Sequence, residues 1–118
     1  TQLTVVFDFP ASQCALAKIR HDAIPVAERF ELYLGSFELA NGYHELTDSV
    51  EQARRFTQDL VTRKQREDIL PDQDMRLLQA LKNLPECAGV AMGIDRLMMA
   101  LLNKKEISEV IAFDFSRA

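Results

Sequence analysis

The first thirty residues alternate between apolar and polar stretches, and the pattern predicts a strand followed by a loop. The run 3–9 is apolar and rich in β-branched residues up to Asp8, and Pro10 ends it, so a buried strand is expected there. Residues 11–28 are mixed in polarity and contain Pro25, which is typical of a loop. The first strand is therefore expected to be separated from the next strand by this loop.

A hairpin is expected at 29–40. Residues 29–34 alternate, with Phe30, Leu32 and Leu34 on one face and Glu31 and Tyr33 on the other. Gly35 and Ser36 suit a two-residue turn, and 37–40 returns as the second strand. The hairpin is expected to be half-buried, with one apolar and one polar face.

Helical spacing dominates the middle of the chain. From Asp48 to about Arg66 the apolar residues recur three or four positions apart, at Val50, Ala53, Phe56, Leu60 and Val61. Asp48 suits the N-cap, and Glu51 follows it three residues later, as in a capping box. A second helix, bounded by prolines, is expected over 71–85.

The last third predicts a strand, a helix and a strand. Residues 87–92 form a short apolar run suited to a buried strand, Gly93 breaks it, and 94–103 has the pattern of a helix. Residues 109–115 are expected to form a final strand. Helices grouped between hairpin-type strands, with no linker or repeat, predict one α+β unit in which helices flank a mostly antiparallel sheet.

Composition excludes several classes of protein. The chain has 118 residues, of which 47% are hydrophobic and 27% charged, which is enough for a packed core. Its 14 basic and 18 acidic residues give a formal charge of -4. That charge disfavours an independent nucleic-acid-binding protein, because phosphate neutralisation needs a basic face. The apolar runs are far shorter than the ~20 residues of a membrane span.

The first residues and the cysteines bear on location. Thr1-Gln2-Leu3 has no initiator Met and no basic segment of a signal peptide, so we expect a chain cut from something longer. Cys14 and Cys87 have neither metal-binding spacing nor a secretory context, which is typical of reduced thiols in a cytosolic protein. A cytoplasmic location is therefore expected.

Two carboxylates of the hairpin form the first candidate site. With the expected turn, Glu31 lies opposite Ala40, and Glu31 and Glu38 are diagonal neighbours about 7–8 Å apart on one face. Carboxylates at that separation repel unless a cation lies between them, and Mg²⁺ accepts such ligands, usually together with substrate phosphates. The alternative is a solvent-facing pair, since antiparallel sheets commonly keep one wet face.

The segment after the second strand is the second candidate. Asn41-Gly42 is a strong hairpin signal, so a plain turn is its simplest interpretation. Asn41, Tyr43 and Glu45 share one face of an extended segment, whereas Glu38 has the opposite parity. All four face one pocket only if the strand bulges or twists near Gly42. A glutamate in such a pocket, beside a tyrosine and an asparagine, suits recognition of an ammonium group.

Arg96 is the third candidate, in the first turn of the helix expected after Gly93. The helix dipole disfavours a cation there by roughly 0.3–1 kcal/mol, which favours an anionic partner. A helix N-terminus attracts phosphate, and an arginine adds a planar fork that also stacks on a base. The alternative is an Asp95 cap with Arg96 simply exposed.

Three stretches jointly resemble the C-terminal half of a class II lysyl-tRNA synthetase catalytic core. They are Arg29-Phe-Glu-Leu-Tyr33, Glu38-Leu-Ala-Asn-Gly-Tyr-His-Glu-Leu-Thr-Asp48 and Gly93-Ile-Asp-Arg-Leu97. The last resembles the family's motif 3, and the resemblance extends from Phe7 to the end of the chain.

Within this family the chain is most similar to the shortened paralogues that modify elongation factor P with (R)-β-lysine. The chain has Pro10-Ala-Ser-Gln13 where the synthetases carry Pro-x-Glu-x-Ser-Pro, His44 where they tend to have Ser, and Ala91 where they have Gly. The added methyl of Ala91 would alter the fit of the amino acid's α-amino region, which suits a substrate whose amino group is displaced.

The resemblance implies a partial class II synthetase fold and a ligase that acts in translation by modifying a protein. ATP and lysine or (R)-β-lysine would form an aminoacyl-adenylate, and the acyl group would pass to a lysine of elongation factor P. The implied ATP contacts are Glu31 and Glu38, which would hold Mg²⁺ against the phosphates, and the catalytic residue Arg96. The implied amino-acid pocket contains Asn41, Tyr43, Ala91 and, near the side-chain ammonium, Glu45.

The resemblance also implies that residues 1–118 are the C-terminal portion of a catalytic domain. Motif 3 is included, but motif 1, a dimer element, and motif 2, whose arginine contacts the α-phosphate, are missing. We therefore expect these residues alone to be inactive and the full-length protein to be a homodimer. One alternative is a lysyl-tRNA synthetase core that charges tRNA, and another is a non-catalytic paralogue fragment that binds a ligand or a partner.

Overall fold

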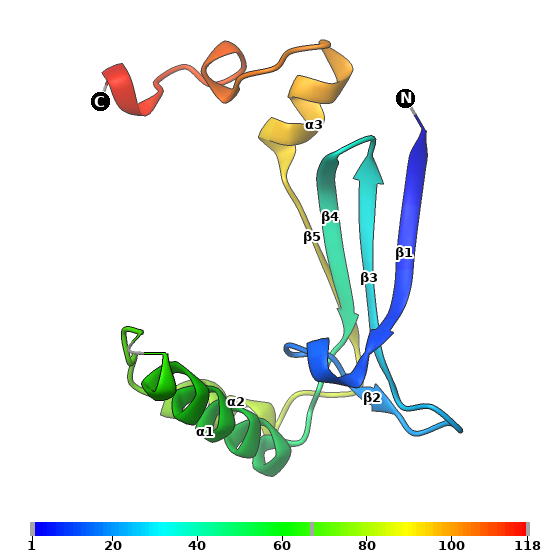
Figure 1. Ribbon diagram of the computed structural model, residues 1–118, viewed down its shortest axis with the longest axis vertical. Coiled ribbons are helices and arrows are strands. Elements are labelled where there is room, and N and C mark those ends of the chain that lie inside the picture. The colour runs from blue at the N-terminus through cyan, green and yellow to red at the C-terminus, as the bar shows by residue number, and fades with distance from the viewer. Residues whose placement is uncertain (1, 67, 118) are drawn as a thin grey trace.

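A computed structural model describes residues 2–66 and 68–117, so Thr1 and Ala118, at the ends of the expected domain, and Glu67 lie outside the described residues. The strands form one antiparallel sheet in the order β1-β3-β4-β5, and β2 pairs with β3. The strands are β1 Leu3–Pro10, β2 Ile19–Arg20, β3 Val26–Leu34, β4 Phe37–His44 and β5 Ala88–Met92. The predicted α+β class with a mostly antiparallel sheet is confirmed (Figure 1).

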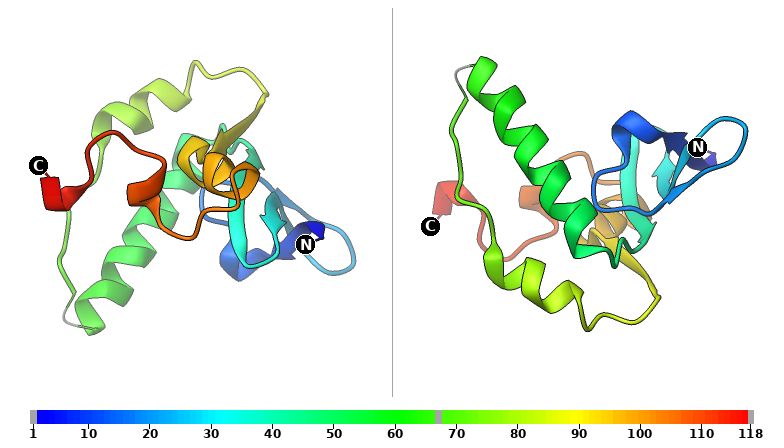
Figure 2. Two further views of the ribbon diagram at one scale, coloured as in Figure 1. Left: turned by 90° about the horizontal axis from the view of Figure 1, so that it is seen from above. Right: turned by 90° about the horizontal axis from the view of Figure 1, so that it is seen from below.

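The helices lie beyond the two ends of the sheet (Figures 1 and 2). Helices α1 (Ser49–Gln65) and α2 (Met75–Leu81) pack together at one end, and α3 (Ile94–Leu101) contacts β4 at the other. The short 3-10 turns are Ala11–Gln13, Ile107–Glu109 and Phe115–Arg117. Within the described part of the chain, none of the helices has the length and apolar content that crossing a membrane requires.

Two strands that we expected to be buried are exposed. The exposed fraction is 53% for Val5 and 68% for Phe7 on β1, and 66% for Val90 on β5. Both are outer strands of the described sheet, and the helices lie beyond its ends rather than over these strands (Figure 1). The apolar sequence of β1 and β5 therefore predicted the two strands correctly, but the prediction that they are buried was wrong.

The core extends from the helices α1 and α2 through the middle of β4 to α3. Its buried apolar residues are Ala17, Ala27, Leu39, Ala40, Leu46, Leu78, Leu81 and Met99. Arg55 connects α1 to the strand region, because its Nη1 donates to the backbone oxygen of Ala17 at 2.8 Å.

Element boundaries differ from the expectation where backbone pairing decides them. Strand β3 begins at Val26 inside the expected loop, and β4 continues to His44, because each has a neighbour to pair with. Asp48 caps α1 as expected, by accepting from the backbone nitrogens of Val50 and Glu51. Helix α2 begins only at Met75, behind the N-cap Asp74, and not at 71.

The strand expected at 109–115 is wrong. The segment instead contains the 3-10 turn at Ile107–Glu109, and a capping box joins Glu106 and Glu109 at its start. Lys104 adds an ion pair to Glu109 at 3.0 Å. These local contacts satisfy backbone groups that a strand would have offered to a neighbour.

Gly42 is required because its neighbours leave no room for a side chain. A Cβ atom there would lie 2.7 Å from Cζ of Phe30 and 2.9 Å from the backbone oxygen of Gly89.

We predict that Gly42→Ala lowers the free energy of unfolding by about 1–3 kcal/mol, measured by denaturant titration of the intact protein. Gly93→Ala is the control, because its Cβ would meet only Arg96 at ordinary distances, and its cost should stay below about 1 kcal/mol. Equal losses would contradict the steric explanation.

The stability of α1 should depend on pH through Glu51. Hydrogen bonds from Arg54 and then Arg55 lower the pKa of this carboxyl to about 2. Since the folded pKa lies below the unfolded value of about 4.3, the ionised group stabilises the fold above that value. The stabilisation is lost as pH falls towards 2.

We predict that Glu51→Gln lowers the free energy of unfolding at pH 7 by about 0.5–1 kcal/mol, a small value because Arg54 is largely exposed. The difference from the wild type should shrink between pH 4.5 and 2, because Glu51 becomes protonated in the folded protein as the pH approaches its pKa of about 2. Denaturant titrations at several pH values measure it, with Asp59→Asn on the same helix as the control. A difference that is independent of pH would contradict the assignment.

Candidate active site

An extra residue in β4 brings the candidate side chains to one face of the sheet. Tyr33 pairs with Glu38, but Leu32 pairs with Ala40, so Leu39 has no partner on β3. This bulge reverses the parity of β4, and side chains before and after it share a face. A bulge or twist near Gly42 was the condition for one shared pocket; the structure has the bulge three residues earlier, and β4 continues through Asn41 and Gly42 without a turn.

The bulge also corrects the expected register. Glu31 lies opposite Asn41 and not Ala40. Glu38 and Asn41 are now on the same face, and Nδ2 of Asn41 donates to Oε1 of Glu38 at 3.3 Å. The two carboxylates of the hairpin are therefore grouped with the asparagine between them.

The start of α3 is attached to the bulge. The backbone nitrogen of Gly93, the N-cap of α3, donates to the oxygen of Leu39 at 2.9 Å. Nη1 of Arg96 donates to the backbone oxygen of Glu38, also at 2.9 Å. Gly93 is thus the cap in place of Asp95, and Arg96 is exposed but anchored to a carbonyl.

Two adjoining hollows follow β4 and β5 from this point. The first, of about 410 Å³, is lined among others by Glu38, Asn41, Ala91 and Arg96. The second, of about 290 Å³, is lined among others by Asn41, Tyr43, Glu45 and Ala91. Asn41 and Ala91 belong to both hollows, so six of the seven candidate residues border one continuous surface.

Glu45 lies at the far end of this surface from Arg96. Its backbone nitrogen donates to the oxygen of Cys87 at 2.9 Å, next to the start of β5. Its carboxylate lies over Gly89, where a Cβ atom would come within 2.5 Å of Oε1. Gly89 therefore leaves the space that the carboxylate occupies.

Glu31 is the candidate residue that borders neither hollow. It is 8% exposed, and its two carboxylate oxygens accept hydrogen bonds from the hydroxyl of Tyr33 and the guanidinium of Arg29. The hydrogen bond from Tyr33, followed by the contact with Arg29, holds the pKa of this carboxyl below its ordinary value. Burial opposes the shift, so the two donors keep a nearly buried carboxylate ionised.

Arg29 in turn packs against aromatic rings. Its guanidinium carbon lies 4.3 Å from the ring centroid of Phe9 and 5.8 Å from that of Tyr43. Arginine commonly stacks on rings in this way. Arg29 therefore contacts both Glu31 and Tyr43, and Tyr43 lines the second hollow.

The acidic pair alone does not complete a metal site. Across residues 2–66 and 68–117, no group of three or more His, Cys, Asp or Glu side chains is arranged to hold a metal ion. A carboxylate has about four acceptor positions, so Glu31 retains capacity after its two hydrogen bonds. Glu31 and Glu38 fit a cation that takes its other ligands from phosphate oxygens and water.

Three residues at the site were not among the candidates predicted from the sequence. Tyr33 could have been found by alternation, because it was already placed on the face of Glu31. Arg29 has the same parity, but its contact with Glu31 depends on side-chain conformation. The space at Gly89 depends on a neighbouring strand, and no local pattern signals it.

The chain matches known proteins over nearly its whole length. Residues 1–117 match the family described as tRNA synthetases class II (D, K and N). A relative from Haemophilus ducreyi, named elongation factor P–(R)-β-lysine ligase, is 53% identical over 98% of this chain and 36% of its own length. Relatives with that name from Pectobacterium carotovorum and Yersinia enterocolitica are 54% and 53% identical, each over 96% of this chain and 35% of their own length.

The chain covers only part of the relatives that it matches. The chain spans about a third of the curated relatives that it matches. The strands, the bulge and α3 all lie within the matched residues. The chain belongs to the family of class II tRNA synthetases (D, K and N).

Proposed function

We propose that the full-length protein activates lysine or (R)-β-lysine with ATP and transfers the acyl group to a lysine of elongation factor P. The continuous surface from Arg96 to Glu45, created by the bulge at Leu39, carries the proposal. It has a cation at one end, suited to phosphate, and a carboxylate at the other, suited to an ammonium group. The names of the relatives support the same acyl group and acceptor.

The amino acid would lie along β4 and β5. Glu45 would bind its side-chain ammonium, since a carboxylate seated over Gly89 is held in place before the substrate arrives. Asn41 and Tyr43 would flank the chain of the substrate, and the methyl of Ala91 would shape the part of the pocket that receives the other amino group. The substrate carboxylate would then point towards Arg96.

The first reaction step needs no general base, because the substrate carboxylate is itself the nucleophile. Its oxygen bonds to the α-phosphorus of ATP, and the bond from that phosphorus to the pyrophosphate oxygen breaks. In the second step the amine of the acceptor lysine attacks the acyl carbon, releases AMP and loses a proton. Stabilisation of phosphate charge is the main catalytic requirement.

Arg96 would provide part of that stabilisation. Its hydrogen bond to the carbonyl of Glu38 orients the guanidinium, and its other N–H groups would contact the ATP phosphates, or the guanidinium would stack on the adenine face. Glu31 and Glu38 would hold Mg²⁺, which supplies positive charge next to the phosphates when bound. Arg29 and Tyr33 would keep the carboxylate of Glu31 ionised and oriented for this role.

The proposal is tested with the full-length protein in two assays. ATP–pyrophosphate exchange that depends on lysine or (R)-β-lysine, followed by transfer of labelled acyl group to elongation factor P, is the expected result. Transfer to tRNA alone would favour the lysyl-tRNA synthetase alternative. Binding of ATP and lysine without any exchange would favour a non-catalytic paralogue, and either outcome would overturn the proposal.

Glu45 should control the affinity for the amino acid but not for ATP. We predict that Glu45→Gln raises the KM for the amino acid about 30-fold or more, because a neutral amide loses the charge-assisted contact with the ammonium. The KM for ATP should stay within about twofold, because Arg96 lies at the other end of the surface. Pyrophosphate exchange at varied concentrations of each substrate measures both constants.

Glu109→Gln is the matched control for this variant. It also removes one carboxylate charge, but Glu109 pairs with Lys104 after α3, outside the residues that border the two hollows. Both constants should remain at their wild-type values in the control. An equal rise of both constants in Glu45→Gln would contradict a role in binding the ammonium.

A further inference from the structure

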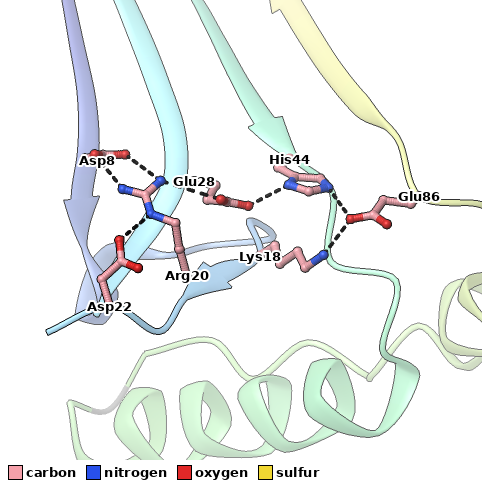
Figure 3. A network of polar contacts seen from close by, with 7 residues as sticks. All are labelled: Asp8, Lys18, Arg20, Asp22, Glu28, His44 and Glu86. Atoms are coloured by element: carbon pink, nitrogen blue, oxygen red, sulfur yellow. Dashed lines mark hydrogen bonds and ion pairs between the residues drawn. The ribbon is translucent and has the colours of Figure 1, made fainter. Parts of the chain in front are cut away.

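A chain of charged side chains lies at the ends of the strands, on the sheet face opposite the candidate site (Figure 3). Its members are Asp8, Lys18, Arg20, Asp22, Glu28, His44 and Glu86. Glu28 and His44 have the opposite parity to Arg29 and Tyr43, which places the two sets on different faces. The proposed reaction uses none of these seven residues.

His44 is the central member, because each of its ring nitrogens contacts a different carboxylate. Nδ1 lies 2.5 Å from Oε2 of Glu28, and Nε2 lies 3.1 Å from Oε1 of Glu86 (Figure 3). The ring therefore lies between the two carboxylates, with one nitrogen turned towards each.

The two carboxylates come from opposite sides of β4. Glu28 belongs to β3, whereas Glu86 precedes β5 by two residues. Lys18 contacts the second carboxylate as well, because its Nζ lies 2.6 Å from Oε1 of Glu86, and its backbone nitrogen donates to the oxygen of His44 at 2.8 Å. Arg20 supports the first, with Nη1 3.5 Å from Glu28.

This bridge lies directly behind the part of the site that faces the amino acid. Glu45 follows His44, points to the other face and is bonded through its backbone to Cys87, which follows Glu86. The carboxylate of Glu45 then lies over Gly89 on the same segment. Any shift of residues 86–89 relative to the end of β4 would move Glu45 and its support apart.

We propose that His44 is a positioning residue for the amino-acid end of the site. Its bridge from Glu28 to Glu86 holds residues 86–89 against the end of β4 and thereby fixes Glu45 over Gly89. The inference rests on the proposed function in assigning the ammonium to Glu45. It concerns only that end, because the ATP end depends on the separate contacts of α3 with the bulge.

Two variants of the full-length protein test the bridge. His44→Gln can reach one carboxylate but not both, and Glu86→Gln removes the charge of a side chain that is 68% exposed and so does not threaten folding. Each should raise the KM for the amino acid about tenfold with little change in the KM for ATP. The double variant should raise the KM for the amino acid by less than the product of the two single effects, because both single variants break the His44–Glu86 contact.

Hydrogen exchange gives a second readout that does not require activity. The amide of Glu45, bonded to Cys87, should exchange faster in His44→Gln and Glu86→Gln than in the wild type. Glu109→Gln, which breaks the ion pair with Lys104, is the control and should leave this amide unchanged. A merely structural role would instead lower overall stability and affect both KM values together.

The outcomes separate the inference from the proposed function. If the wild type carries out ATP–pyrophosphate exchange and the two variants keep the wild-type KM for the amino acid, the inference is overturned and the proposed function stands. If the wild type shows no ATP–pyrophosphate exchange, the proposed function fails. If in addition the Glu45 amide is equally protected from hydrogen exchange in the wild type and the variants, the bridge is overturned as well. In that second case, faster hydrogen exchange of the Glu45 amide in the variants than in the wild type would still support the bridge.

Discussion

The bulge at Leu39 is the constraint on which the site depends. Without the extra residue, the alternation of β4 would place Glu38 on the opposite face from Asn41, Tyr43 and Glu45. Two consecutive carbonyls at the bulge receive hydrogen bonds from the start of α3, one from Gly93 and one from Arg96. The same contacts therefore change the parity of the strand, attach the helix and orient the cation.

Charged groups on the two faces of the sheet have different tasks. On the site face, Glu31 is nearly buried and is kept ionised by hydrogen bonds from Tyr33 and Arg29, a costly arrangement that suits a group meant to meet a cation. On the other face, charges are paired with each other around His44 and join β3 to the segment before β5. Carboxylates on the site face thus lie beside Arg29, Tyr33 and Asn41, whereas the other face uses paired charges to join the strands.

Local patterns predicted what local physics controls. The alternation at 29–34, the turn at Gly35-Ser36 and the Asp48 cap are all present in the structure, because each depends on neighbours in the sequence. The prediction failed for the burial of β1 and β5 and for the strand at 109–115, because these depend on what packs against the segment. An apolar run predicts a strand equally well in a core and at an outer edge.

The sequence alone determined the class of fold, the residue types of the site and the resemblance to a family, since propensity, periodicity and motifs are properties of the chain itself. It showed that the candidate residues share one face only if the strand bulges or twists, but it could not locate the bulge, because a one-residue shift in register is decided by cross-strand packing and by the helix hydrogen-bonded to the bulge. Only the tertiary structure grouped Arg29 and Tyr33 with Glu31, seated Glu45 over Gly89 and joined His44 to Glu28 and Glu86. Each of these contacts joins side chains whose positions depend on the conformation of the strands and loops, and alternation along the chain does not encode them.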